Sequence, residues 1–406
     1  MRKPLITAIA VLLVVIGGVV VYLLATTPKS AQPVRFPLGA SHRQLLARVP
    51  ASAEAFALIP SAALLHGKLL ANPVTRDAVT QWTQEHELPK SWMLGGADLA
   101  VWKNGKTTSY AVRLDAFRAL VVRAWLLLSS TADARWDGST LIMHETAAPT
   151  TAASDLDELL RLAAGLPEGD VFVVQRRGGR GAFPPIARPA VTSLRVTPAE
   201  ILVVSRAASD DIAVSREIRP RFPRNAMLSA TFAAPPRLLG DLNRLLATKI
   251  DALIDEGGSV ALYDVEGGTL LPRPKGVIAI PADDRAREEL ENIERVAALV
   301  GEMRDTGDQI LISFDRSSMA QYSEDEMVPA SWPSTRWALR IDPAKLIPVL
   351  RRAGDSPGLR FAAPRLHRAA RDLRRWMDAL HSADAVEAAA SVAGGVEELR
   401  VRVTSK

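Results

Sequence analysis

The sequence predicts an α+β protein in which an N-terminal transmembrane helix precedes largely antiparallel sheets with amphipathic helices. Three observations support this fold class. The run from Leu5 to Ala25 carries no charged side chain. After it, short strand-like segments outnumber long helical ones, and turn residues recur between them. Closely spaced turns favour antiparallel pairing, because parallel strands need crossover connections of about a dozen or more residues.

The N-terminal apolar run is long enough to cross a bilayer once. Leu5 to Ala25 covers 21 residues, and a hydrocarbon core about 30 Å thick needs about 20 helical residues. Arg2 and Lys3 precede the run, which favours a cytoplasmic N-terminus and an extracytoplasmic remainder. The alternative is a cleaved signal peptide, whose apolar region usually spans about 7–15 residues and ends at small residues. Leu23-Leu24-Ala25 departs from that pattern, so we expect an uncleaved anchor.

Composition narrows the class of protein. Hydrophobic residues make up 48% of the 406 positions and charged residues 23%, which is typical of a globular protein. The chain has no cysteine, which excludes disulfides, thiol nucleophiles and cysteine-ligated metals. The net charge of +5 is mild for this length. We expect a single-pass protein of the bacterial inner membrane with most of the chain in the periplasm, a location that argues against a nucleic-acid partner.

Proline and low-complexity segments divide the chain. Pro28, Pro33 and Pro37 follow the anchor closely and favour an extended tether. A second proline-containing stretch near Arg219 to Pro223 separates two regions that are each long enough for a domain. We expect a signal anchor at 1–25, a tether at 26–41, a first α+β domain at 42–218 and a second α+β domain at 219–406.

The Asn104-Gly105 pair is the best local signal in the first domain. It lies between strand-like runs at 97–103 and 107–114 and favours a type I′ hairpin, because both central turn positions need φ > 0. Asp115 then fits the N-cap of a helix that extends to about Trp125. The other expected elements are strands at 54–59, 140–144, 171–175, 191–196 and 201–206, a helix from about Pro73, and a helix from Ser154 to about Gly165.

The second domain shows the same kinds of signal. Gly257-Gly258 opens a strand that extends to Val265, and Gly394-Gly395 separates two final strands. The other expected elements are strands at 276–280 and 310–314, and helices at 238–255, 285–303 and 366–380.

Three short similarities suggest that the second domain is a divergent repeat of the first. Their offsets of 227, 173 and 161 residues disagree, so simple recurrence of a strand–helix pattern is the alternative interpretation. The pairs are Tyr110–Asp115 with Trp337–Asp342, then Arg48-Val49-Pro50 and Ala53 with Arg221-Phe222-Pro223 and Ala226, and finally Gly96, Ala100 and Trp102 with Gly257, Ala261 and Tyr263.

This layout resembles a group of single-pass bacterial envelope proteins. The resemblance consists of the anchor, the proline-containing tether, the segment Val49 to Phe56, and hairpins followed by amphipathic helices. It implies a location and a fold class only, because it includes no motif that assigns a catalytic, cofactor or metal residue.

The usual catalytic and metal-binding patterns are missing from the sequence. The six histidines are scattered and show no His-x-x-x-His spacing. Neither Gly-x-Ser-x-Gly nor Ser-x-x-Lys occurs, and no phosphate-binding glycine loop is present. We therefore expect no catalytic, cofactor-binding or metal-binding residue that motif spacing can identify, and the protein leans away from being an enzyme.

Arginines form two candidate contact sites. Arg176, Arg177 and Arg180 lie in a glycine-rich segment that could hold an anion or be a solvated loop. The helix at 366–380 is amphipathic, and Arg365, Arg368 and Arg371 occupy its polar side beside a stripe of Leu366, Ala370, Leu373, Met377 and Leu380. Such a helix either lies on an anionic membrane or packs on a core with a solvated basic side. Glu324-Asp325-Glu326 is interpreted as a solvated acidic turn.

Taken together, these features favour a non-catalytic binding or scaffolding role in the bacterial cell envelope. The expected partners are the membrane, through Leu5 to Ala25, and an envelope protein or hydrophobic ligand. A carrier of lipid or another hydrophobic ligand is one alternative, and an envelope hydrolase with an unrecognised site is the other.

Overall fold

The structure is a computed structural model that describes residues 34–85, 97–104, 107–129, 134–143, 155–176, 189–209, 217–233, 257–266, 273–283, 287 and 301–406, apart from single positions within these ranges. The chain divides into two compact units, Met1–Ala208 and Ser209–Lys406. Both units combine helices with an antiparallel sheet, so the expected α+β class with antiparallel pairing is confirmed. Within the described ranges no helix is long and apolar enough to span a membrane. Leu5 to Ala25 and the helix expected at 238–255 lie outside these ranges.

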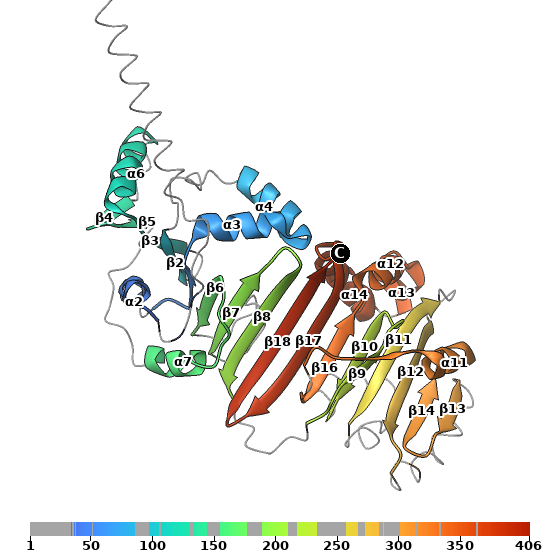
Figure 1. The fold of residues 1–406 in the computed structure, drawn as a ribbon. Coiled ribbons are helices and arrows are strands. Elements are labelled where there is room, and N and C mark those ends of the chain that lie inside the picture. Colours follow the sequence, from blue (N-terminus) through green and yellow to red (C-terminus); the bar gives the residue numbers. More distant parts are fainter. Residues whose placement is uncertain are drawn as a thin grey trace, which may run out of the picture. The chain divides into compact units, whose positions relative to one another are not determined.

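In the first unit, the sheet strands follow the order β4-β5-β3-β2-β1-β6-β7-β8 (Figure 1). Every neighbouring pair in this order is antiparallel. The strands are β1 (Ala55–Ile59), β2 (Asp98–Asn104), β3 (Thr107–Arg113), β4 (Ala134–Asp137), β5 (Thr140–Met143), β6 (Val171–Gln175), β7 (Ala190–Val196) and β8 (Glu200–Ala208).

Hydrophobic clusters cover both faces of this first sheet, since successive strand residues point to opposite sides. Ala111 belongs to a cluster around Phe56 and Phe172, whereas the next residue, Val112, belongs to a cluster with Val122. Val122 lies on α6 (Ala116–Ser129). Asp115 caps the start of this helix as expected, because its Oδ1 accepts a hydrogen bond of 2.8 Å from the Arg118 N–H. The helices are α2 (Ala40–Leu46), α3 (Ala62–Ala71), α4 (Pro73–Glu85), α6 (Ala116–Ser129) and α7 (Asp155–Ala163).

In the second unit, the sheet order is β13-β14-β12-β11-β10-β16-β17-β18, again with antiparallel neighbours. A separate antiparallel pair joins β9 (Arg221–Pro223) to β15 (Met327–Pro329). The sheet strands are β10 (Leu228–Phe232), β11 (Gly258–Glu266), β12 (Arg273–Pro281), β13 (Glu302–Asp305), β14 (Gln309–Ser313), β16 (Trp337–Ile341), β17 (Ala383–Ala393) and β18 (Val396–Ser405).

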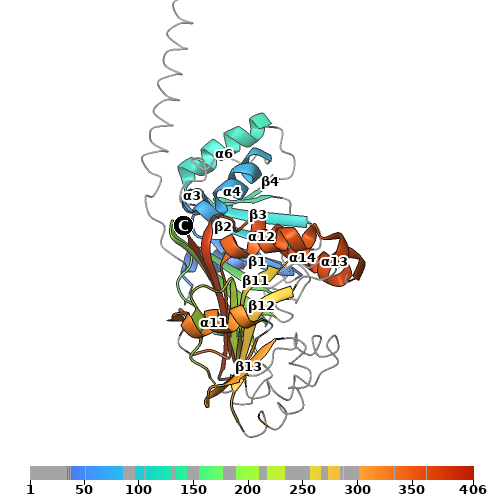
Figure 2. The ribbon, with the colours of Figure 1, turned by 90° about the vertical axis from the view of Figure 1, so that its right-hand side faces the viewer.

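Helices cover both faces of the second sheet as well (Figure 2). Met319 and Tyr322 of α11 pack with Ala261, whereas the next strand residue, Leu262, packs with Leu346 on the opposite face. The latter face is covered by α12 and α14. The helices of this unit are α11 (Arg316–Glu324), α12 (Pro343–Gly354), α13 (Pro357–Ala362) and α14 (Pro364–Asp378).

The two sheets have the same strand order. If the sheet strands of each unit are numbered from one to eight along the chain, both orders become 4-5-3-2-1-6-7-8. Each unit also has an isolated antiparallel bridge to the residue two positions before its sixth strand, between Val34 and Gly169 in the first unit and between Ile218 and Thr335 in the second. The connection from the sixth to the seventh strand differs most in length, because it covers residues 176–189 in the first unit and 342–382 in the second, where it includes α12, α13 and α14.

The strand order also shows which of the three sequence similarities fall at equivalent positions of the two units. Arg48-Val49-Pro50 and Arg221-Phe222-Pro223 both precede the first sheet strand of their units, and Trp102 and Tyr263 both lie on the second. Tyr110 and Trp337, however, lie on the third and sixth strands. The longest similarity therefore joins non-equivalent strands, which share it because each ends in an aspartate that caps a helix.

Two local expectations need correction. Asn104 is the last residue of β2 and pairs with Thr107, so the two residues between the strands are Gly105 and Lys106 instead of Asn104-Gly105. The helix expected at 285–303 ends too late, because Glu302 and Met303 belong to β13, where Met303 packs with Phe232 and Ile280. Packing against the sheet therefore outweighs the helical periodicity and makes the end of this segment a strand.

Candidate binding surface

The helices α12, α13 and α14, which we call the helical layer, lie together in the second unit (Figure 1). Asp342 caps α12, since its Oδ1 accepts a hydrogen bond of 3.3 Å from the Lys345 N–H, and Pro343 occupies the first helical turn. Leu346, Val349 and Leu350 then fall on one side and are buried. The apolar side of α12 therefore faces the sheet, and its polar side is left for solvent.

α14 packs beside α12 through the same apolar cluster. Met377 is buried there, and Ala370 and Leu380 are packed against it. These three residues belong to the stripe expected from the sequence, so this side of α14 is a core-packing face. Leu373 belongs to the same expected stripe but is 41% exposed. It is one of two large apolar side chains described as exposed, together with Leu120 of α6.

Basic side chains surround the C-terminal end of α12. Arg351 and Arg352 lie in its last turn, where a positive charge complements the partial negative charge of the helix end. Arg352 forms an ion pair of 3.0 Å with Asp264 of β11, and Arg374 of α14 reaches Asp355 at 3.4 Å. The stem of Arg371 crosses this end so closely that a Cβ added to Gly354 would lie 3.3 Å from its Cγ. The contacts of Arg374 and Arg371 fix α14 against the end of α12, and the ion pair of Arg352 fixes α12 on the sheet.

The acidic side chains do not balance the basic ones. The connection from β16 to β17, residues 342–382, has nine lysines and arginines but four aspartates. Its formal charge of +5 equals that of the whole chain. Arg351, Arg352, Arg360, Arg368 and Arg371 are all exposed, with Arg368 also engaged in an interaction. The helical layer therefore presents a positive surface to solvent.

The first unit has its own arginine-rich connection at the same topological place. Residues 176–189, between β6 and β7, contain four arginines and no acidic residue. Arg176 of this segment is described, and it serves the fold. Its Nη1 donates a hydrogen bond of 2.8 Å to the Pro50 carbonyl, and its guanidinium lies 5.5 Å from the centre of the Phe56 ring. Arg177 and Arg180 lie outside the described residues.

The structure brings together two of the three arginines expected on the final helix. Arg368 and Arg371 are exposed on α14, and Arg365 lies in its first turn. Sequence patterns did not identify Arg351, Arg352 or Arg360 as parts of the same surface. The signal for α12 was present in Asp342-Pro343 and in the apolar spacing after it, but the packing of α12 against α14 is a tertiary contact.

The acidic turn Glu324-Asp325-Glu326 has a structural role. Asp325 accepts hydrogen bonds of 3.0 Å from both the backbone N–H and the side-chain Nδ2 of Asn225, and Glu326 pairs with Arg224 at 2.7 Å. These bonds join the end of α11 to the segment after β9. Across the described ranges, no group of three potential metal-ligating side chains converges.

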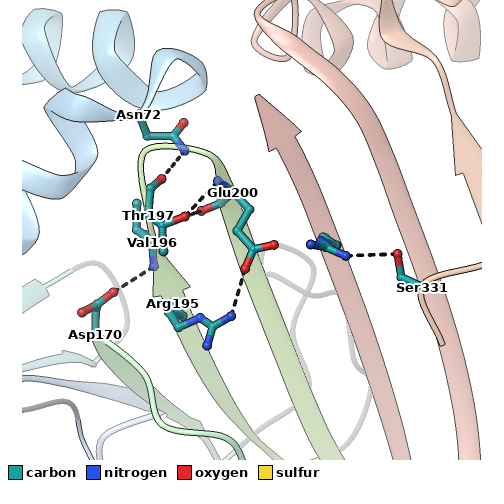
Figure 3. A network of polar contacts seen from close by, with 8 residues as sticks. Asn72, Asp170, Arg195, Val196, Thr197, Glu200 and Ser331 are labelled. Carbon is teal, nitrogen blue, oxygen red and sulfur yellow. Dashed lines mark hydrogen bonds and ion pairs between the residues drawn. The ribbon is translucent and has the colours of Figure 1, made fainter. Parts of the chain in front are cut away.

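A partly buried polar network organises one end of the first unit (Figure 3). Asn72 is fully buried between α3 and α4, and its Nδ2 donates a hydrogen bond of 2.7 Å to the Thr197 carbonyl in the β7–β8 turn. Asp170 accepts bonds of 2.8 Å from the Val196 N–H and of 2.6 Å from Lys68 Nζ. The network therefore fixes the two helices on the strand ends and leaves these groups engaged in the fold.

A second polar network lies on the sheet of the second unit. Arg340, Glu387 and Arg402 stand in register on β16, β17 and β18. Glu387 is mostly buried, pairs with Arg340 at 3.1 Å and accepts a bond of 3.2 Å from the Ser331 N–H. Arg402 donates to Ser331 Oγ at 3.3 Å. This carboxylate is thus neutralised by its neighbours, as a structural ion pair requires.

Two buried tyrosines, Tyr322 on α11 and Tyr263 on β11, were not expected as special residues. Burial raises the pKa of Tyr263 strongly, and the negative charge of Asp325 adds to the effect. Burial likewise raises the pKa of Tyr322. Both phenols are therefore neutral at physiological pH. They contribute to the core with Ala261 and Met319.

No protein-family match was found for the chain, and neither the curated proteins nor the solved structures include a match to it. The positive helical layer is consequently described from its own chemistry. Exposed guanidinium groups bind carboxylates and phosphates through directed hydrogen bonds. The surface is suited to binding an anionic partner.

Proposed function

We propose that this chain is a membrane-anchored, extracytoplasmic protein with a non-catalytic binding or scaffolding role in the bacterial envelope. The apolar run from Leu5 to Ala25 supports the anchor, and Arg2 with Lys3 supports the orientation. The two folded units would then stand outside the cytoplasm. The observation that carries the binding role is the positive helical layer, whose exposed arginines exceed the aspartates around them.

We further propose that the two units are diverged copies of one module. The shared strand order and the equivalent bridges before the sixth strand support this proposal. Residues that hold both copies together belong to the common scaffold, whereas residues present in only one copy are candidates for a specific function. The helical layer occupies the connection whose length differs most between the copies, which supports a specialised role for it.

A pair of reporter fusions tests the anchored topology. Alkaline phosphatase, which is active only after export, is fused after Lys406, and a fluorescent protein that matures only in the cytoplasm is fused at the same position. The proposal predicts an active phosphatase and a dark fluorescent protein. The same fusions lacking residues 1–25 serve as the matched control and should show the reverse pattern. A fluorescent full-length fusion with an inactive phosphatase would overturn the proposal.

A further inference from the structure

We propose that the helical layer of the second unit docks on anionic phospholipid headgroups of the membrane that anchors the chain. This proposal rests on the proposed function, because it needs the folded units to be held beside a bilayer. It goes further by naming the partner of the positive surface as a lipid phosphate layer.

The first argument is the segregation of charge. Residues 342–382 have a formal charge of +5, and residues 176–189 have +4, whereas the entire chain has +5. The rest of the protein therefore carries a net negative charge of −4. A uniformly charged protein would not be oriented by an anionic surface, but one with this distribution is attracted through the β16–β17 connection. The proposed site includes only the helical layer, whose residues are described.

The second argument is how far each arginine of the helical layer is neutralised by an ion pair. Arg351 pairs with Asp378 at 3.9 Å, and Arg352 pairs with Asp264, so these two charges are partly neutralised. Arg360 lies in the last turn of α13 and is exposed, and Arg371 is exposed with its stem over Gly354. The positive charge that remains is spread along α13 and α14. An extended phosphate layer matches such a spread better than a single compact anion.

The third argument is an exposed leucine on the helix that carries these arginines. Leu373 belongs to the apolar stripe of α14, on a different side of the helix from Arg371, and it is 41% exposed. Helices that lie at a membrane interface combine basic residues with apolar side chains that reach below the headgroups. An acidic protein partner would need the arginines but not an exposed leucine. The combination therefore favours lipid as the occupant.

The anchor makes a weak contact sufficient. Eight residues separate Ala25 from Val34, which already bridges to Gly169 in the first unit, and an extended chain of that length reaches at most about 30 Å. A surface linked to the membrane meets lipid at high effective concentration, so a contact too weak to bind a free protein can still be populated. We expect the attraction to be screened by salt, because the Debye length falls from about 10 Å at 0.1 M to about 3 Å at 1 M.

The absence of native cysteines allows a direct test on the full chain in lipid nanodiscs. Leu373→Cys carries an environment-sensitive fluorophore, and Ala320→Cys on α11 carries the same fluorophore on the opposite side of this unit's sheet. The proposal predicts a blue-shifted, lipid-quenchable signal at position 373 in discs with phosphatidylglycerol. Phosphatidylcholine discs or 1 M salt should abolish at least four-fifths of that signal. Position 320 should show no shift in either lipid.

A charge-matched pair of variants separates the surface from net charge. Arg360→Gln, Arg368→Gln and Arg371→Gln together should abolish the shift at position 373. Arg219→Gln, Arg221→Gln and Arg224→Gln remove the same charge from exposed positions near β9 and should leave the shift intact. Far-ultraviolet circular dichroism and the thermal midpoint verify that both triple variants fold.

Three outcomes would overturn the proposal. An equal shift in neutral and anionic discs would show a contact that does not depend on phosphate charge. An equal loss with both triple variants would show a general effect of net charge. A reporter that ignores anionic lipid but responds to added polyglutamate would assign the surface to an acidic protein partner. None of these outcomes affects the reporter fusions, so failure of the lipid contact is distinguishable from failure of the anchored topology.

Discussion

At the residue scale, the buried polar groups of the first unit have defined structural tasks. Asn72 illustrates this, because its two amide functions serve two different partners. Its Nδ2 donates to the Thr197 carbonyl, and its Oδ1 accepts a bond of 2.9 Å from the Val74 N–H at the start of α4. One side chain thus caps a helix and joins it to the β7–β8 turn.

We expect Asn72→Ala to lower the free energy of unfolding by about 2–3 kcal/mol, because it leaves a buried carbonyl and a helix-end N–H without these partners. Thr80→Ala is the matched control, since the exposed Thr80 hydroxyl only bonds to the Arg76 carbonyl within α4. That change should cost less than about 0.5 kcal/mol. Urea unfolding of the full chain in mild detergent gives both values, and equal costs would contradict the role assigned to Asn72.

Asp315 makes the stability of the second unit depend on acid pH. Burial raises its pKa, but hydrogen bonds from Ser317 and Ser318 outweigh burial and hold the pKa below its usual value. A lowered pKa in the folded state stabilises the protein above the unfolded pKa of about 3.9, and this contribution is lost as the pH falls through the folded-state pKa.

Asp315→Asn should therefore flatten the loss of stability below about pH 4, because asparagine does not titrate. Asp384→Asn, at an exposed position of β17, is the control and should not change how the thermal midpoint falls with decreasing pH. Thermal midpoints measured across the acid range provide the comparison. Midpoints that fall identically in wild type and Asp315→Asn would show that Asp315 does not contribute.

At the element scale, the β17–β18 hairpin depends on two glycines with left-handed backbone. Gly394 has φ 57° and Gly395 has φ 74°, as a type I′ turn requires. Gly395→Ala should cost about 1–2 kcal/mol in unfolding free energy, because a Cβ disfavours that region. Gly39→Ala is the control, since Gly39 has φ −64° and open space around its Cβ position. If Gly395→Ala proved as mild as Gly39→Ala in urea unfolding, the turn assignment would be contradicted.

Elements with local signals were predictable, whereas those defined by tertiary contacts were not. Gly394-Gly395 located the final hairpin, and Asp115 located the start of α6, because each residue acts on its own backbone neighbours. β13 was missed since Glu302 and Met303 continue a helical pattern and become a strand only beside β14. The binding surface was half predicted for the same reason. Arg368 and Arg371 follow from one helix, but Arg351 joins them only through the packing of α12 on α14.

At the scale of the whole molecule, the shared strand order predicts that each unit is a folding unit. Phe56, Phe172 and Val122 lie in clusters of the first unit, whereas Met227 and Met319 lie in clusters of the second. We expect fragments 34–208 and 209–406, the first of which keeps the bridge between Val34 and Gly169, each to give native-like circular dichroism and a cooperative unfolding transition without an oxidant. The two fragments produced together are the control. Folding only when both are present would contradict two independent copies.

The central claim is that an N-terminal anchor holds both units outside the cytoplasm. The cysteine-free chain permits a direct measurement in cells, because any label must be on the introduced residue. Ala78→Cys reports on the first unit and Ala320→Cys on the second, and both positions are exposed. A membrane-impermeant maleimide is added to cells whose outer membrane has been opened and whose inner membrane is intact. The account predicts full labelling of both positions before lysis, whereas labelling that occurs only after the inner membrane is broken would contradict it.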